Sequence, residues 1–128
     1  MFTNLNVFRL AHAMASHAGA RQAVVARNMA NADTPGYAAQ DIAPFAETYQ
    51  APGQGMGLRA TRPDHLNGTA SDAFEVIDRR GAERDPNGNS VTLETEMLNA
   101  VAVKRQHDRA LAIYKSSLSV LRTAIGRR

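Results

Sequence analysis

Cysteine and tryptophan are both missing from this chain, and aromatic residues make up only 5% of its 128 residues. Without cysteine the chain can form neither a disulfide nor a thiolate, which excludes thiol catalysis and thiolate metal sites. With so few large aromatic side chains, any core must be shallow and closely packed, with alanine as a main component. The length allows a single domain, spanning residues 1–128.

Long apolar runs are missing as well. No stretch of the sequence reaches the roughly 18 apolar residues that cross a bilayer. The first residues resemble a secretion signal only superficially, because Arg9 interrupts the apolar stretch and no basic segment precedes it. If the chain leaves the cytoplasm, we expect it to be exported without a cleaved signal peptide.

Residues that could carry catalysis or bind a cofactor are few and poorly spaced. His12, His17, His65 and His107 include no pair three or four residues apart, the spacing that places two metal ligands on one helix face. Residues 52–57, PGQGMG, lack the preceding strand, the following helix and the Lys-Ser/Thr pair of a phosphate-binding loop. No GxSxG nucleophile motif occurs. We therefore expect no metal, no cofactor and no enzymatic activity.

Charge is divided unevenly along the chain. Residues 1–32 carry three arginines and no acid, residues 33–103 carry eleven acids and five arginines, and residues 104–128 carry seven basic residues and one acid. A basic surface that binds nucleic acid normally includes stacking aromatics, and the basic C-terminal part contains only Tyr114. We expect no nucleic-acid partner, and a basic helical adaptor for nucleic acid or anionic membrane stays the less favoured alternative.

The C-terminal part shows the clearest periodicity. Apolar residues recur at alternating steps of four and three, which predicts a helix from about 92 to 126 with a seam that packs against another helix. Thr92 is the expected N-cap and Gly126 the expected end. Lys104 and His107 are polar breaks that could set the register. The apolar members of this seam are Leu93, Met97, Ala100, Leu111, Tyr114, Leu118, Leu121 and Ile125.

The N-terminal part predicts a second long helix, from about 4 to 31. Its apolar face is rich in alanine, which favours helix formation and lets a partner helix approach closely. Gly19 is the one weak position in this helix. The face consists of Leu5, Phe8, Ala11, Ala15, Ala18, Val25 and Met29.

Residues 32–91 form the expected turn and connector. The segment 50–57 is flexible by composition, residues 73–77 (AFEVI) could form one strand, and the Asn-Gly within 83–90 indicates a turn. Its apolar content is too low for a core of its own. The predicted fold is therefore mainly α, with two long N- and C-terminal helices packing as a coiled-coil-like hairpin joined by an extended, largely irregular middle segment. The seam is too long for one short partner, so we infer assembly through helices.

The stretch NMANADTPGY, residues 28–37, ends the first helix with more polar residues than a simple stop needs. Asn28 and Asn31 are three apart and share a helix face, where a buried carboxamide must find specific partners. Asn31 could also take a left-handed C-cap conformation. Thr-Pro-Gly-Tyr at 34–37 fits a type II turn, with glycine where a positive φ is required. Tyr37 should then pack back against the helix end.

This stretch resembles the signature of bacterial flagellar axial proteins, the rod and hook family, at the end of the first helix. Other segments agree with rod proteins of this family: residues 61–66 (TRPDHL), 88–91 (GNSV) and 121–125 (LRTAI). The sequence departs at 38–40, AAQ, where relatives usually carry a basic residue. The resemblance implies that Asn28, Asn31, Thr34, Pro35, Gly36 and Tyr37 form an assembly motif.

The function implied by the resemblance is structural. Such a subunit of the proximal rod would stack helically and transmit torque from the membrane ring to the distal rod and hook. It would be exported through the flagellar type III apparatus and assemble in the periplasm. The implied partners are copies of itself, other proximal rod proteins, the adaptor protein FliE and the membrane-ring and export-gate region. Another proximal rod subunit of the same family stays the nearest alternative.

Overall fold

A computed structural model describes residues 2–49, 74–79, 81 and 83–126, and the side chains from residue 6 onward within the first of these ranges. Several sequence predictions therefore lie outside the described residues: those for the loop at 52–57, for the motif at 61–66, for His65 and for the side chain of Leu5.

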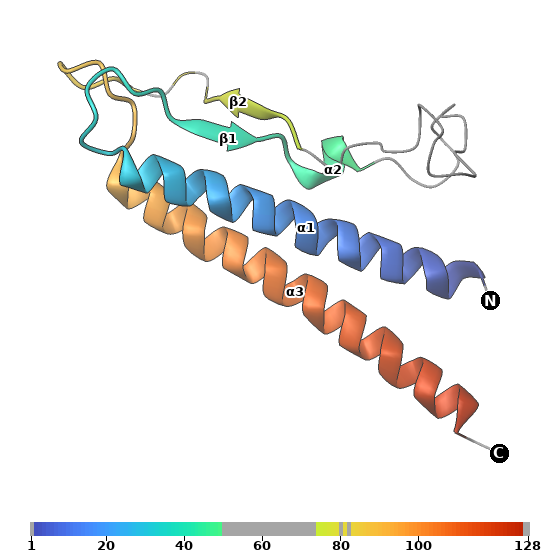
Figure 1. The fold of residues 1–128 in the computed structure, drawn as a ribbon. Helices are drawn as coiled ribbons and strands as arrows, with labels where there is room; N and C mark the ends of the chain where they lie inside the picture. Colours follow the sequence, from blue (N-terminus) through green and yellow to red (C-terminus); the bar gives the residue numbers. More distant parts are fainter. Residues whose placement is uncertain (1, 50–73, 80, 82, 127–128) are drawn as a thin grey trace, which may run out of the picture.

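Two long helices form an antiparallel hairpin, with both termini at the same end (Figure 1). Helix α1 spans Phe2–Ala30 and helix α3 spans Leu93–Ile125. The predicted mainly α fold is confirmed, and the helix limits differ from the predicted ones by at most two residues. Among the described helices, none combines the length and apolar character needed to cross a membrane.

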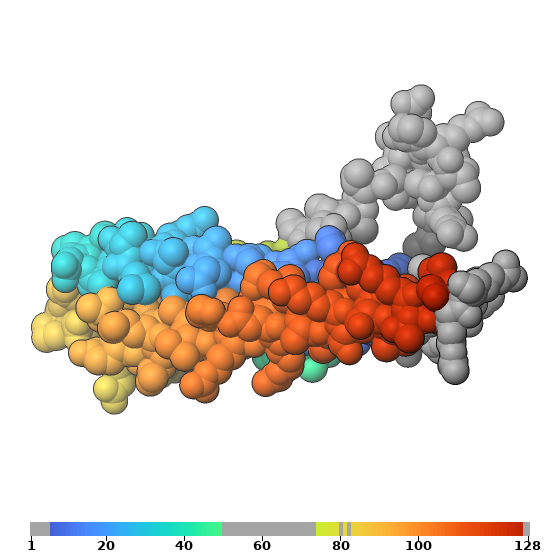
Figure 2. Space-filling model, turned by 90° about the horizontal axis from the view of Figure 1, so that it is seen from below, coloured from blue at the N-terminus to red at the C-terminus, as the bar shows by residue number. Residues whose placement is uncertain are grey.

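The contact between the helices is built on small side chains. Ala11, Ala18 and Val25 of α1 are buried, and α3 buries Val103 and Ala110. Small residues at these positions let the helix axes approach closely, as the alanine-rich face predicts. The space-filling view shows the two helices lying against each other (Figure 2).

The face of α3 that meets α1 is not the predicted seam. The buried positions Glu96, Val103 and Ala110 follow a seven-residue spacing one stripe away. Each buried position has a seam residue four positions later, which at 3.6 residues per turn is rotated by about 40° around the helix, so only part of the seam faces α1. Of the apolar seam residues, Ala100, Leu118 and Leu121 are half-buried, whereas Leu93, Met97, Leu111, Tyr114 and Ile125 are exposed. Packing of these residues against another chain stays a prediction.

The connector contributes a short antiparallel ribbon that lies along α1 (Figure 1). Strand β1, Gln40–Ile42, pairs with strand β2, Val76–Asp78, so that Ile42 lies opposite Val76. A single helical turn, α2, spans Phe45–Thr48. The strand expected at 73–77 corresponds to β2, displaced toward the C-terminus. Strand β1 was not predicted, because three residues are too few to show an alternating pattern.

The turn after α1 has the predicted form. The N–H of Tyr37 donates to the carbonyl of Thr34 at 3.3 Å, and Gly36 has φ of 75°, as a type II turn requires. Asn31 does not adopt the left-handed conformation that the sequence allowed: among the described residues, only glycines have a positive φ. Thr92 occupies the N-cap position of α3, but its side chain makes no capping hydrogen bond.

Two glycines separate the effect of backbone conformation from that of space. A Cβ added at Gly19 or at Gly36 would meet no heavy atom within 4 Å, but only Gly36 has a positive φ. We expect Gly19→Ala to raise the free energy of unfolding by about 0.5–1 kcal/mol, since alanine is the better helix former. Gly36→Ala should lower it by about 1–2 kcal/mol through left-handed strain. Urea unfolding followed by far-UV circular dichroism measures both, and an equal effect of the two substitutions would contradict the argument.

Candidate functional site

Asn28 stands at the centre of the polar cluster at the end of α1. Its side chain is 0% exposed. Nδ2 donates to the carbonyl of Gln40 at 2.7 Å and to Oε2 of Glu96 at 3.0 Å. Oδ1 accepts from the N–H of Gln40 at 3.1 Å and from the hydroxyl of Tyr37 at 3.3 Å. All four hydrogen-bonding positions of the carboxamide are used, so Asn28 joins α1, the turn, β1 and α3.

The rest of the predicted assembly motif divides into an inner and an outer part. Tyr37 is half-buried and points back to Asn28, as predicted. Asn31 donates from Nδ2 to the carbonyl of Arg27 at 2.8 Å, and its Oδ1 accepts from Thr34 Oγ1 at 3.2 Å. The segment 34–36 is exposed. The structure thus brings Asn28 and Tyr37 into the fold and leaves Thr34, Pro35 and Gly36 at the surface.

Asn89 closes the end of α1 from the far side of the connector. Its Nδ2 lies 3.0, 2.7 and 2.8 Å from the carbonyl oxygens of Asn31, Ala32 and Thr34. Its Oδ1 accepts from the N–H of Val91 at 2.7 Å. Carbonyls at a helix end lack partners within the helix, so Asn89 supplies a cap that is distant in sequence. From the sequence, Asn89 stands out only as a member of the GNSV segment, without a predicted role.

A buried charged network continues from Asn28 into the ribbon. Glu96 is fully buried, and its Oε1 accepts from Arg79 Nη1 at 2.7 Å. Arg79 Nη2 lies 3.9 Å from Asp41 Oδ2 and has no hydrogen-bond partner in the described part of the chain. Arg21 of α1 donates two hydrogen bonds of 2.8 Å to the carboxylate of Asp41. We call Arg21, Asn28, Asp41, Arg79 and Glu96 the hairpin network.

The ion pair between Arg21 and Asp41 shifts the pKa values of its two groups in opposite directions. Burial alone would raise the pKa of Asp41, but the hydrogen bonds from Arg21 and from the N–H of Ile42, with the charges of Arg21 and Arg79, outweigh it and hold that pKa below its usual value. The hydrogen bond to Asp41 in turn raises the pKa of Arg21. Asp41 is therefore held as a carboxylate that keeps β1 on α1.

His17 anchors the other end of the ribbon. Its ring is buried, and Nε2 lies 2.8 Å from the carbonyl oxygen of Ala43. A carbonyl can only accept, so Nε2 carries the proton, and Nδ1 accepts from the amide of Gln106 at 3.3 Å. The ring meets Phe45 and Phe74 edge to face, with centroids 5.5 and 5.0 Å apart. His17 is thus a structural link between both helices and the connector.

The described acidic and histidine side chains are not arranged as metal ligands would be. Within the ranges that the structure describes, no three or more His, Asp or Glu side chains gather where a metal ion could bind. The ionised groups of the hairpin network are already paired with one another. What the cluster can do is hold the connector in one position on the two helices.

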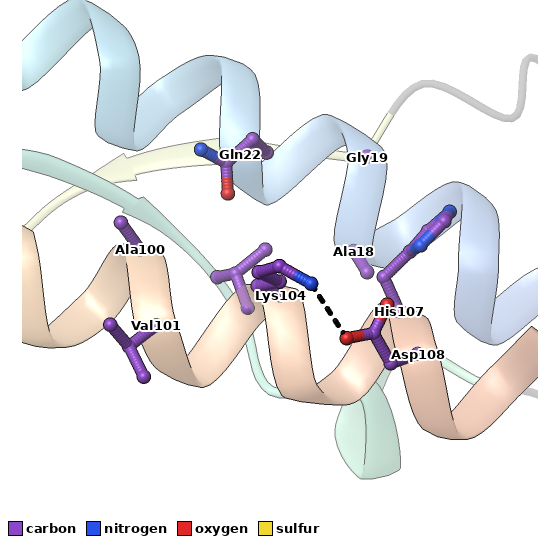
Figure 3. A pocket seen from close by; sticks show the side chains of 9 residues that line it. Ala18, Gly19, Gln22, Ala100, Val101, Lys104, His107 and Asp108 are labelled. Carbon is purple, nitrogen blue, oxygen red and sulfur yellow. Dashed lines mark hydrogen bonds and ion pairs between the residues drawn. The ribbon is translucent and has the colours of Figure 1, made fainter.

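The predicted seam borders a groove between α1 and α3, on the side away from the ribbon (Figure 3). The groove has a volume of about 600 Å³, and its small floor residues include Ala18, Gly19 and Ala100. Farther along, seam residue Tyr114 packs edge to face on Phe8 of α1, with centroids 5.2 Å apart. The structure therefore brings Tyr114 to α1, while Met97 stays at the surface, with the residue 56% exposed.

Sequence reasoning missed most of the hairpin network. It placed none of these residues, Arg21, Asp41, Arg79 and Glu96, in a buried ion pair. One signal was present: Glu96 belongs to the same helix stripe as Val103 and Ala110, and an acid on an otherwise apolar stripe needs a buried partner. Which basic residue would pair with Glu96 could not be predicted, because that depends on tertiary structure alone.

The first prediction from this geometry concerns Glu96. Glu96→Ala would leave Arg79 and Asn28 without their shared partner in a buried site, and we expect the free energy of unfolding to fall by about 3–5 kcal/mol. Glu94→Ala, two residues away and exposed, is the matched control and should change it by less than about 0.5 kcal/mol. Urea titration of both variants measures the difference, and comparable losses would show that the network does not hold the hairpin.

A second prediction follows from the lowered pKa of Asp41. A carboxylate with a depressed folded-state pKa adds stability above its unfolded value of about 3.9, and this stability is lost as pH falls through the lower folded value. Asp41→Asn should lower the free energy of unfolding by about 1–3 kcal/mol near neutral pH and flatten its decline below about pH 5. Asp33→Asn, an exposed substitution in the same connector, should keep the wild-type pH profile. Parallel profiles for all three proteins would contradict the assignment.

Comparison with known proteins agrees with the family that the sequence resembles. Residues 14–37 match the family described as "Flagella basal body rod protein". The matched segment includes Asn28 and Tyr37 of the cluster. The chain is 38% identical over 116 residues to "Flagellar basal body rod protein FlgB" of Agrobacterium fabrum, covering 88% of this chain and 87% of the relative. It is 32% identical over 106 residues to the protein of the same name from Cereibacter sphaeroides, covering 82% of each. The chain therefore belongs to the flagellar basal body rod protein family, with FlgB proteins among its relatives.

Proposed function

We propose that this chain is a subunit of the proximal part of the flagellar rod, which assembles helically and transmits torque toward the distal rod and hook. Membership of the rod family makes it a structural subunit of the basal body. The observation that carries the finer proposal is the exposed part of the apolar seam, which one copy leaves uncovered. Such a surface is typical of proteins that bury it against neighbours.

The division between the hairpin network and the seam supports this function. The network fixes both helices and the ribbon within one subunit, through buried polar groups that accept few alternative arrangements. The seam residues Leu93, Met97 and Leu111 remain available outside it. A subunit that stacks needs both properties, a defined shape and an uncovered apolar face.

The proposed partners are those that the family resemblance implies. They are copies of the same chain, other proximal rod proteins, the adaptor FliE and the membrane-ring and export-gate region. We place the chain in the periplasmic part of the basal body, delivered by the flagellar type III apparatus without cleavage of a signal peptide. Mass spectrometry of the intact protein from purified basal bodies would test the last point, since a cleaved form would have a lower mass.

The deciding experiment is an immunoblot for this chain in purified hook–basal bodies, beside cytosolic and soluble periplasmic fractions from the same cells. We expect enrichment in the basal bodies. If the protein is instead abundant in the cytosol and missing from the basal bodies, the proposal fails, and salt-dependent binding to DNA or anionic vesicles would test the adaptor alternative.

The exposed turn at 34–36 gives a prediction about assembly. Gly36→Val places a β-branched residue at φ of 75° and should strain the turn by roughly 1 kcal/mol or more. We expect impaired incorporation into basal bodies and reduced swimming in soft agar, with export into the medium or periplasm retained. Gly81→Val, at a glycine with φ of 77° outside the turn and with no heavy atom within 4 Å of an added Cβ, carries the same backbone strain; it is the control and should swim normally. Normal motility of Gly36→Val would show that the turn has no part in assembly.

A further inference from the structure

Strand β2 exposes apolar and acidic side chains together. Val76 and Ile77 are 41% and 45% exposed, and their neighbours Glu75 and Asp78 are exposed as well. Successive side chains of a strand point to opposite faces, so each face of β2 carries one apolar and one acidic side chain. The sheet of the described residues has two strands, which leaves the second edge of β2 without a strand partner.

One side of α3 carries the complementary pattern. Seven residues follow each other at steps of four, three or seven, which places them along one side of the helix. Three are apolar, three are basic, and the single acid, Asp108, is already paired with Lys104 at 2.8 Å (Figure 3). We call this set the α3 stripe: Met97, Val101, Lys104, Asp108, Leu111, Lys115 and Arg122. It is exposed along its whole length.

Ribbon and stripe lie on opposite sides of the subunit. The side of α3 that faces the connector is marked by Glu96, which binds Arg79, and by Gln106, which binds His17 beside Ala43. The view onto the helices shows only small parts of β2 and α2, which lie behind them (Figure 2). The two complementary surfaces therefore cannot meet within one copy, but they can meet between two.

The groove provides space for incoming side chains beside the stripe. Val101 and Lys104 belong to both, and the groove floor opposite them is formed by Ala18 and Gly19 of α1. No heavy atom lies within 4 Å of the position where Gly19 would carry a Cβ.

We propose that one face of β2 of one copy docks on the α3 stripe of a second copy, with the apolar side chain of that face beside Val101 and Leu111 and the acid of the same face against Lys104 or Lys115. The occupant is a second copy because this chain itself carries the matching charges and apolar residues. The contact joins two different surfaces, so each added copy leaves a free ribbon and a free stripe, and the assembly stays open. The inference rests on the proposed rod function and adds which faces meet.

The absence of cysteine makes a cross-linking test clean. Val76→Cys and Ile77→Cys are made separately, because these side chains occupy opposite faces of β2, and each is mixed with Leu111→Cys under mild oxidation. We expect a disulfide-linked dimer from at least one mixture, and none from the ribbon variants alone. Val120→Cys lies nine residues from Leu111, on the opposite side of α3, and is the matched control. The yield of disulfide-linked dimer from the mixture with Leu111→Cys should exceed the yield from the mixture with Val120→Cys roughly tenfold.

Charge reversal provides the second measurement, by sedimentation velocity. Glu75→Lys with Asp78→Lys, and separately Lys104→Glu with Lys115→Glu, should each abolish self-association, whereas mixing the two variant proteins should restore it. Equal cross-linking through Val120→Cys, no product from either ribbon variant, or no recovery on mixing would overturn the inference. If these outcomes occur while the protein is present in basal bodies, only the inference fails. If cross-linking succeeds but the basal bodies lack the protein, the proposed function fails instead.

Discussion

The buried carboxylate of Glu96 is the constraint on which the rest of the structure depends. An ionised carboxylate in a protein interior is strongly destabilising unless charge and hydrogen bonds compensate for its lost hydration. Here the compensation comes from three elements at once: Asn28 on α1, Arg79 next to β2 and Asn99 on α3 itself. Because no single element satisfies the carboxylate, the two helices and the ribbon are stable only in one mutual arrangement.

The small size of the interhelical side chains explains why a polar constraint is needed. Ala11, Ala18 and Ala110 bury little apolar area, and alanines can slide past one another with little change in packing. A buried hydrogen bond between Asn28 and Glu96 is lost by such a slide, so it specifies the register that the alanines do not. The larger apolar residues, Met97 and Leu111 among them, are thereby left for contacts outside the subunit.

The parts that could be predicted from the sequence were those with local causes. Long periodicity fixed both helices, and Pro35 with Gly36 fixed the turn, because each signal lies within a few residues of the structure it produces. Of the ribbon, β2 was predicted and β1 was not, since a three-residue strand depends on its partner rather than on its own pattern. The cluster around Asn28 was anticipated only as a need for partners. Asn89, Arg79 and Glu96 are up to 68 residues away, and local patterns do not reveal such pairs.

The hairpin network also links the two surfaces that the proposed contact between copies uses. Arg79 directly follows β2, and Glu96 directly precedes Met97, the first residue of the α3 stripe. Their 2.7 Å hydrogen bond therefore fixes the docking strand relative to the surface on which the next copy would dock. In a heterologous assembly, the rotation and rise from one copy to the next are set by the geometry between those two surfaces. In the proposed assembly, the same buried ion pair that stabilises one hairpin would also set the step from one copy to the next, which gives a physical reason for placing a charge in so small a core.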